Sequence, residues 1–292
     1  MSEPLTSEPM LALSGLTRPS FEVPKGACDA HMHVFGPEAR YPRVPKPHYT
    51  LPDGKLEHFH DLMKVLHLDR YIIVQPSFYG TDNSCLIDSL KLGGAAARGV
   101  IMVEDDVTPA ELEAFHGHGV RGLRLDLFKR AEMPIEDIQA YITKMAAKIA
   151  PLGWHLQFYV PGRVVRDLID FLGTLTAPYV IDHMGYMMEE DGLTEKDFKR
   201  LLSLMTESHC YLKLSGPYRV AKNKGYEAVA HVAKAIVETA SQRAIWGSDW
   251  PHIPKSGRDT GELLNLLVDW APDPADRQHI LVDNPLKLFD FK

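Results

Sequence analysis

Two histidines separated by a single residue are the most informative chemical feature of this sequence. His31 and His33 end the apolar segment 27–35, and residues i and i+2 of a β-strand project from the same face. A lone carboxylate, Asp249, ends another short apolar run more than two hundred residues later. Imidazoles and a carboxylate can move protons, polarise a carbonyl group or bind a divalent metal. The two segments together predict an enzyme.

Short β-rich runs alternate with longer amphipathic stretches from residue 25 onward, which is the pattern of repeated βα units. We expect strands at 27–34, 70–75, 99–103, 120–125, 154–159, 178–182, 210–214 and 243–247. We expect helices near 56–67, 83–96, 109–117, 135–150, 161–173, 194–207, 225–240 and 258–270. Eight βα units predict an α/β fold of the (β/α)8, or TIM, barrel type, because no Gly-x-Gly-x-x-Gly follows the first run to indicate a dinucleotide-binding sheet.

Composition limits the classes of partner and the domain organisation. A net charge of −7 argues against nucleic acid or an anionic membrane as a partner. Three widely separated cysteines indicate neither a disulfide framework nor a structural zinc site, so we expect a cytoplasmic protein. Residues 1–24 are rich in Ser, Pro and Glu and predict a flexible N-terminal arm rather than a signal peptide. Residues 25–292 then form one catalytic barrel domain, either monomeric or a small homo-oligomer.

Polar residues at the carboxyl ends of the strands are the site candidates, because barrel enzymes place their chemistry there. Almost every predicted strand end offers at least one: His31, His33, Gln75, Ser77, Arg124, Gln157, Tyr159, His183, Arg219 and Asp249. The proline-rich stretch 35–56 is too long for an ordinary βα connection, so we expect an ordered loop over the mouth that brings in Tyr49. A single histidine at a strand end is more often structural, and Arg124 and Arg130 can equally pair with surface carboxylates.

The sequence resembles the amidohydrolase superfamily, whose barrel carries His-x-His on strand 1 and an aspartate after strand 8. The resemblance is closer to the branch of 2-pyrone-4,6-dicarboxylate lactonase, which also includes galactarolactone isomerase and sulfomuconolactone hydrolase. The matching segments span nearly the whole chain and are 29–37, 80–83, 153–155, 181–185, 211–216, 246–252 and 284–285.

This resemblance implies a lactonase that acts on the ester carbonyl of a small anionic lactone, of the pyrone dicarboxylate or aldarolactone class. His31, His33 and His183 would polarise the carbonyl, and Asp249 would be the general base for water. Arginines grip carboxylates through bidentate contacts. The substrate-binding set would therefore be Arg124, Arg130 and Arg219, with Tyr49, Ser77 and Tyr159 as supporting donors.

Metal is the main question that the resemblance leaves open. A binuclear site needs a bridging lysine or glutamate, and neither 120–127 nor 154–159 supplies one. The lactonases that this chain resembles work without metal, so we favour a site without a cofactor. A single divalent ion such as zinc, if one binds, would use His31, His33, His183 and Asp249.

Substrate and reaction type also stay open at this point. The lactonases have an arginine after the strand-6 His-Met-Gly motif, whereas this chain has Tyr186, so the site would bind one carboxylate fewer or a hydroxyl instead. The alternative is a lactone isomerase that interconverts 1,5- and 1,4-aldarolactones. A metal-dependent decarboxylase and a non-catalytic binding barrel are further alternatives.

Overall fold

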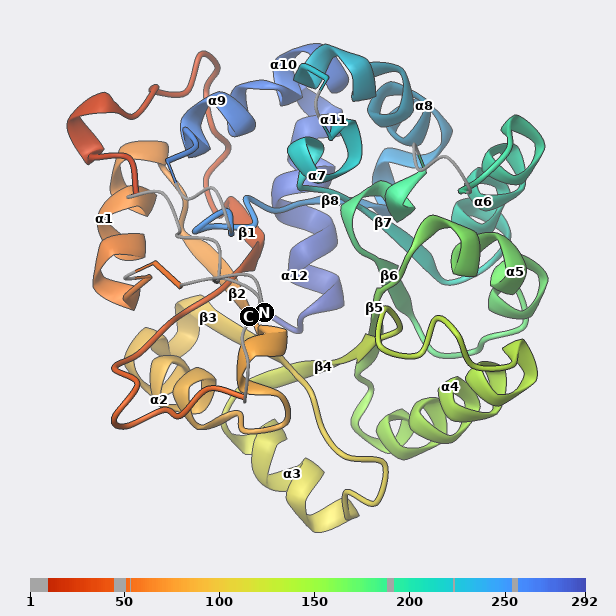
Figure 1. Ribbon diagram of the computed structural model, residues 1–292. Coiled ribbons are helices and arrows are strands. Elements are labelled where there is room, and N and C mark those ends of the chain that lie inside the picture. The colour runs from red at the N-terminus through yellow and green to blue at the C-terminus, as the bar shows by residue number, and fades with distance from the viewer. Residues whose placement is uncertain (1–9, 45–50, 53, 188–191, 223, 254–256) are drawn as a thin grey trace, which may run out of the picture.

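A computed structural model describes residues 10–44, 51–52, 54–187, 192–222, 224–253 and 257–292. Its sheet has eight parallel strands in the order of the sequence: β1 Cys28–Met32, β2 Arg70–Val74, β3 Ala97–Ile101, β4 Val120–Asp126, β5 His155–Tyr159, β6 Tyr179–Ile181, β7 Cys210–Leu214 and β8 Ala244–Trp246. Figure 1 looks along the axis of this ring of strands, with most helices around it and the C-terminal helix overlapping the ring in this view. The predicted (β/α)8 barrel is confirmed.

The outer layer of helices contains α1 Leu56–Leu66, α2 Ser84–Gly93, α3 Pro109–Gly117, α4 Ile135–Ile149, α5 Gly162–Leu172, α6 Glu195–Glu207 and α8 Ala230–Ala240. Two of them begin with a capping box, in which a threonine and an acidic residue three positions later satisfy free backbone N–H groups: Thr108 with Glu111, and Thr194 with Asp197. α5 buries Val164, Val165, Leu168, Ile169 and Leu172 against the sheet, the one-sided pattern that amphipathic helices show.

The predicted elements correspond to those of the structure, with differences at some boundaries. The predicted helix 225–240 begins as a 3-10 turn, Tyr226–Val229, before α8, and 258–270 divides into α9 Thr260–Asn265 and α10 Leu267–Trp270. The sequence analysis assigned no elements to the C-terminal segment, which contains α11 Pro274–Gln278, a π-helical turn His279–Asp283 and α12 Asn284–Leu288. No helix among the described residues is long and apolar enough to cross a membrane.

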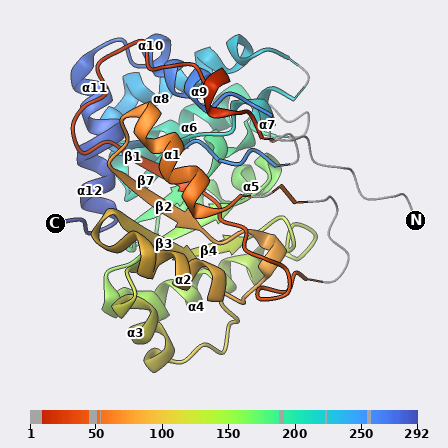
Figure 2. The ribbon, with the colours of Figure 1, turned by 90° about the vertical axis from the view of Figure 1, so that its left-hand side faces the viewer.

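The C-terminal segment closes one end of the barrel, which we call the floor. Figure 2 shows α11 and α12 gathered at that end. Leu288 and Phe289 belong to a buried apolar cluster with Cys28 and Ile72 of the first two strands, and the ring of His155 meets Phe289 edge-on at 5.0 Å. Because the floor is packed with side chains, the opposite end, the mouth, is where the carboxyl ends of the strands are free to form a site.

The barrel closes between β1 and the residues that follow β8. The Asp249 N–H donates to the His31 carbonyl at 2.7 Å, and the His33 N–H donates to the Trp250 carbonyl at 2.8 Å. The pairing register of β1 with β2 shifts between Asp29 and Met32, and such a bulge re-aims side chains. Closure therefore brings the two histidines of β1 beside Asp249.

The predicted N-terminal arm is described from residue 10 onward. The Thr17 N–H donates to the Asp259 carboxylate, and the Ser20 N–H donates to Asn265 Oδ1 at 2.7 Å. Both partners belong to the start and end of α9, so this part of the arm is anchored to the barrel. Tyr49 lies outside the described residues.

Candidate active site

The mouth contains a tight cluster of two imidazoles and one carboxylate. His31 Nε2 lies 3.3 Å from His33 Nε2 and 3.6 Å from Asp249 Oδ1, and His33 Nε2 lies 3.3 Å from the same oxygen. His31 and Asp249 are buried, and only 7% of the surface of His33 is exposed to solvent. The sequence analysis predicted that these three residues meet, and the structure brings them together.

The proton position on His33 follows from its backbone partner. Its Nδ1 lies 2.8 Å from the Val74 carbonyl oxygen. A carbonyl only accepts hydrogen bonds, so Nδ1 must carry the proton. A neutral His33 therefore presents a lone pair at Nε2, toward His31 and Asp249.

Asp249 is held by two donors on the side away from the histidines. Tyr218 donates its hydroxyl to Oδ2 at 2.5 Å, and Arg219 donates its Nε to the same atom at 2.6 Å. Burial raises the pKa of Asp249, but the Arg219 guanidinium and the neighbouring histidines outweigh it and hold the pKa well below the usual carboxyl range. Asp249 is therefore ionised near neutral pH.

His183 completes the histidine cluster from the end of β6. Its ring centroid lies 5.0 Å from that of His31, and its Nδ1 lies 2.9 Å from Ser215 Oγ, which leaves Nε2 for a ligand. Burial lowers its pKa to about 4, so the ring is neutral. Gly216 has a φ of +55°, and a Cβ there would lie 2.7 Å from His183 Nδ1; glycine is needed for this close approach.

Lys213 and Asp182 lie directly behind His31, and the sequence analysis assigned neither a role. Lys213 Nζ lies 2.9 Å from Asp182 Oδ1 and 3.3 Å from His31 Nδ1. Gln157 Nε2 donates to Asp182 Oδ2 at 3.1 Å. Burial raises the pKa of Asp182, but Lys213 outweighs burial and the pKa is well below the usual range. A lysine inside an otherwise apolar strand, Tyr211–Leu214, was the signal that could have found this pair.

The strands on the other side of the mouth contribute polar groups of a different kind. Arg124 donates Nη1 to the Gln75 carbonyl at 2.8 Å, and its guanidinium lies 4.5 Å from the centre of the Tyr159 ring. Ser77 donates its hydroxyl to Asp126 Oδ2 at 2.8 Å. Ser77, Arg124 and Tyr159 were predicted from the sequence, whereas the buried carboxylate of Asp126 was not.

Arg130 and Tyr186 occupy different surroundings. The Arg130 guanidinium lies 4.1 Å from the ring centre of Tyr141 on α4, so its described contact is with the outer helix layer and not with the histidines. Tyr186 lies beside His183, with the two ring centroids 5.7 Å apart and perpendicular. Tyr186 therefore borders the site.

Comparison with known proteins supports the resemblance drawn from the motifs. Residues 28–291 match the family model described as amidohydrolase. This chain belongs to the amidohydrolase family. It is 37% identical to a 4-sulfomuconolactone hydrolase from Rhizobium radiobacter, over 92% of each chain. It is 33% identical to a 2-pyrone-4,6-dicarboxylate hydrolase from Comamonas testosteroni, over 94% of this chain and 93% of that one. It is 29% identical to a D-galactarolactone isomerase from Agrobacterium fabrum strain C58, over 97% of each.

The donor atoms of this amidohydrolase have the spacing that one zinc ion needs. Zinc bound at about 2.1 Å in a tetrahedron separates its ligand atoms by about 3.4 Å. The three separations among His31 Nε2, His33 Nε2 and Asp249 Oδ1 are 3.3, 3.3 and 3.6 Å. His31 also forms a second group of this kind with Asp182 and His183. The residues fit one divalent metal, provided that the Nε2 lone pairs are free.

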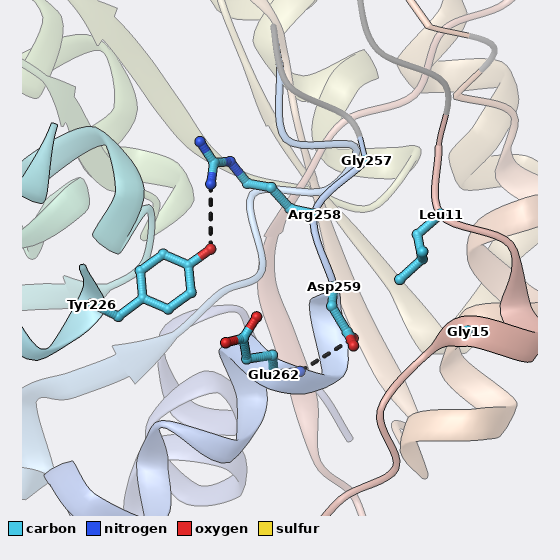
Figure 3. Close-up of a pocket in the computed structure, with 7 residues that line it drawn as sticks. All are labelled: Leu11, Gly15, Tyr226, Gly257, Arg258, Asp259 and Glu262. Carbon is cyan, nitrogen blue, oxygen red and sulfur yellow. Dashed lines mark hydrogen bonds between the residues drawn. The ribbon is translucent and has the colours of Figure 1, made fainter. Parts of the chain in front are cut away.

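A separate surface pocket of about 530 Å³ lies beside the site (Figure 3). Arg258 donates Nη1 to the Tyr226 hydroxyl at 3.3 Å there, and its guanidinium lies 4.1 Å from the ring centre of Tyr218. The described lining residues include none of the predicted site residues. Arg258 therefore links this pocket to Tyr218, the donor to Asp249.

Proposed function

We propose that this amidohydrolase hydrolyses a small lactone that carries a carboxylate, of the pyrone dicarboxylate or aldarolactone class. The main support is the cluster of His31, His33 and Asp249. In this cluster, groups that can bind a carbonyl oxygen lie beside an ionised carboxylate that can take a proton from water. Two of the relatives reported above are lactone hydrolases, which supports the same class of reaction.

Carbonyl activation is assigned to His31 and His183. A neutral imidazole donates from Nε2 when its Nδ1 accepts a hydrogen bond, and in both residues Nδ1 faces a possible donor, Lys213 or Ser215. Each well-placed donor to a developing oxyanion stabilises the transition state by roughly 3 kcal/mol. Because neutral His33 has its proton on Nδ1, we assign it to proton acceptance instead of to carbonyl binding.

Water activation is assigned to Asp249, with His33 beside it. The attacking water oxygen forms the new bond to the carbonyl carbon, and its proton passes to Asp249 Oδ1. The ring C–O bond then breaks, and the leaving oxygen recovers a proton from the Asp249–His33 pair. The Arg219 guanidinium weakens Asp249 as a base by holding its pKa low. A substrate carboxylate that binds Arg219 would offset this charge and strengthen the base when substrate is present.

Binding of the substrate anion is assigned to Arg124 and Arg219, with Ser77 and Tyr159 as supporting donors. Arg219 donates a hydrogen bond from Nε to Asp249 and another from Nη2 to the Ile253 carbonyl. No protein partner of Nη1 is described, so we assign this nitrogen to the substrate anion. Arg130 and Tyr49 stay outside this set, because the described contact of Arg130 is with Tyr141 and Tyr49 lies outside the described residues.

The mechanism needs no metal ion. A zinc ion held by His31, His33 and Asp249 would polarise the carbonyl and lower the pKa of a bound water. We therefore propose a metal-free site.

We propose the cytoplasm as the compartment, because the three cysteines are free thiols.

Lactone isomerisation is the second candidate, supported by the similarity to D-galactarolactone isomerase and by Tyr186 at the border of the site. It needs the same activated carbonyl but a substrate hydroxyl as the attacking oxygen. A hydroxyl held close to the carbonyl can compete with water through its high effective concentration.

Carbon NMR of chelator-treated enzyme distinguishes these reactions. The enzyme is mixed separately with 2-pyrone-4,6-dicarboxylate and with freshly prepared galactaro-1,5-lactone. Open-chain acid from either substrate is the expected result. Conversion of the second substrate to the 1,4-lactone without free acid would instead identify an isomerase. No reaction with either, followed by lactone turnover on adding zinc, would contradict the metal-free proposal. No reaction even with zinc would bring the metal-dependent decarboxylase alternative forward.

A further inference from the structure

We propose that Lys213 is a positioning residue that fixes the tautomer of His31, with the proton on Nε2. This keeps His31 a hydrogen-bond donor toward the mouth and removes the lone pair that a metal ion would need. The catalytic meaning rests on the proposed function, because it concerns the same site. The tautomer itself follows from contacts that involve no substrate.

The first constraint on His31 comes from the mouth side. His33 has a proton on Nδ1, where it faces the Val74 carbonyl, so the neutral form of this ring has a lone pair at Nε2. That lone pair lies 3.3 Å from His31 Nε2. Asp249 Oδ1, the other close neighbour of His31 Nε2, is also an acceptor. A proton on His31 Nε2 can be donated to His33 Nε2 at 3.3 Å, whereas a lone pair there would face two others at short range.

The second constraint comes from the barrel interior. Lys213 Nζ lies 3.3 Å from His31 Nδ1, and an ammonium group has three donors and no acceptor. A proton on Nδ1 would point toward this cation, while a lone pair on Nδ1 accepts a hydrogen bond from it. Lys213 and the two acceptors at the mouth therefore favour the same tautomer. Asp182 Oδ1, which lies 3.4 Å from Nδ1 and favours the other tautomer, is itself paired with Lys213.

Lys213 is itself held in place by groups that have no access to solvent. Lys213 and Asp182 are both fully buried, with Nζ 2.9 Å from Asp182 Oδ1, and Gln157 occupies the second carboxylate oxygen. The buried ammonium thus has an anionic partner, and the lysine cannot turn toward water. Without substrate, the result is one directed chain of hydrogen bonds, from Lys213 through His31 to His33 and the Val74 carbonyl.

Removal of Lys213 leaves Asp182 as the neighbour of His31 Nδ1. Asp182 Oδ1 lies 3.4 Å from that nitrogen and can only accept, so it would favour a proton on Nδ1. His31 Nε2 would then carry a lone pair, and His31, His33 and Asp249 would present three free donor atoms with the spacing of a zinc site. The lysine therefore decides whether this cluster donates hydrogen bonds or binds metal.

The tautomer can be read directly in the wild-type protein. We would label the histidine side chains with nitrogen-15, treat the protein with chelator, and record long-range proton–nitrogen correlations. The His31 signals are assigned from their loss in the variant His31→Gln. The expected spectrum shows a protonated Nε2 and an unprotonated Nδ1. The reverse pattern in the wild type would overturn the proposal.

Zinc binding to Lys213→Met gives an independent readout. Outer-shell partners of metal ligands change metal affinity about 10- to 100-fold, and we expect calorimetry to show zinc binding at least about tenfold tighter than in the wild type. The gain should disappear in the double variant with His31→Gln. Lys234→Met is the matched control, since Lys234 pairs with Asp269 at the surface, and it should bind zinc like the wild type. Unchanged or weaker zinc binding in folded Lys213→Met would contradict the proposal.

These measurements separate the tautomer from the proposed reaction. Neither the spectrum nor the calorimetry uses a lactone. Both results would therefore stay valid if the proposed lactone chemistry proved wrong. If Lys213→Met does not fold, the wild-type spectrum alone decides. On a lactone substrate, Lys213→Met should lower kcat about a hundredfold with little change in KM, because one donor to the oxyanion is lost. A rise in KM at unchanged kcat would assign Lys213 to substrate binding instead.

Discussion

The two sides of the barrel mouth are built differently. The histidine half lies at the ends of β1, β6, β7 and β8 and contains His31, His33, Asp182, His183, Lys213 and Asp249. The arginine half contains Gln75, Ser77, Arg124, Asp126 and Tyr159, from β2, β4 and β5. In the histidine half, the charged groups face oppositely charged or hydrogen-bonding partners at short range, such as Lys213 with Asp182 and Arg219 with Asp249.

Both halves contain buried polar atoms without a hydrogen-bond partner among the described residues: Gln75 Oε1, Arg124 Nε and Asp126 Oδ1 in the arginine half, and Asp182 Oδ1 and Asp249 Oδ1 in the histidine half. Leaving such groups unpaired costs about 1–3 kcal/mol each. The two oxygens of the histidine half lie within 3.6 Å of Lys213 or histidine nitrogens, whereas no ion pair is described at the three atoms of the arginine half. We interpret this as a division of labour, in which the histidine half is organised in advance for chemistry and the arginine half leaves groups for a ligand. Four substitutions test that division.

Asp249→Asn should give the largest effect. The amide keeps the shape of the side chain but cannot take a proton from water, so we expect kcat to fall about a thousandfold while KM changes little. Steady-state kinetics on the hydrolysed lactone measures both. Asp269→Asn, at the surface, is the matched control and should have wild-type kinetics. Retention of a tenth of the wild-type kcat would rule Asp249 out as the base.

Arg124→Met should produce the opposite pattern. A charge-assisted hydrogen bond to a carboxylate contributes roughly 1.5–3 kcal/mol, so we expect KM to rise about 10- to 100-fold with kcat nearly unchanged. Urea unfolding checks that the variant is folded. An equal loss of kcat would place Arg124 in the chemistry and blur the contrast between the two halves.

His155→Leu tests whether the floor can change without affecting the mouth. Burial lowers the pKa of His155 to about 3, from 6.5 in an unfolded chain. Between these values only the unfolded state binds the proton, so the stability contributed by neutral His155 is present above pH 6.5 and is lost as the pH falls.

The size of this effect follows from linkage. His155 should lower the free energy of unfolding by about 1.4 kcal/mol for each pH unit below 6.5, or about 2 kcal/mol at pH 5. His155→Leu should remove that part of the pH dependence in urea unfolding and leave kcat and KM at neutral pH unchanged. Parallel curves for the two proteins would show that His155 is already charged when folded.

Ser77→Ala should give the smallest effect. It removes the hydroxyl that donates to Asp126 Oδ2 in the structure and that we assign to the substrate anion, and one hydrogen bond contributes about 1 kcal/mol. We therefore expect KM to rise about fivefold with kcat preserved. Ser77→Thr keeps the hydroxyl and should behave like the wild type. A change in kcat alone would move Ser77 out of the substrate-binding set.

The fold could be predicted from local patterns. Hydrophobic periodicity locates eight strands and their helices, because which face of a strand or helix is buried depends on residues a few positions apart. His31, His33, His183 and Asp249 were also within reach, since the chemistry of a barrel lies at its strand ends. Arg130 was chosen by the same local logic, and its described contact is with Tyr141 on α4 instead. Local position therefore nominated candidates without ranking them.

The sequence by itself determined the barrel, the family and the identity of the groups at the mouth. Only the tertiary structure decided their partners. Arg219 pairs with Asp249, Asp126 accepts a hydrogen bond from Ser77, and Lys213 lies between Asp182 and His31. His31 and Lys213 are 182 residues apart, and no local pattern encodes a contact over that distance. The contact exists because the strands curve into a closed ring, and closure fixes which inward-facing side chains meet.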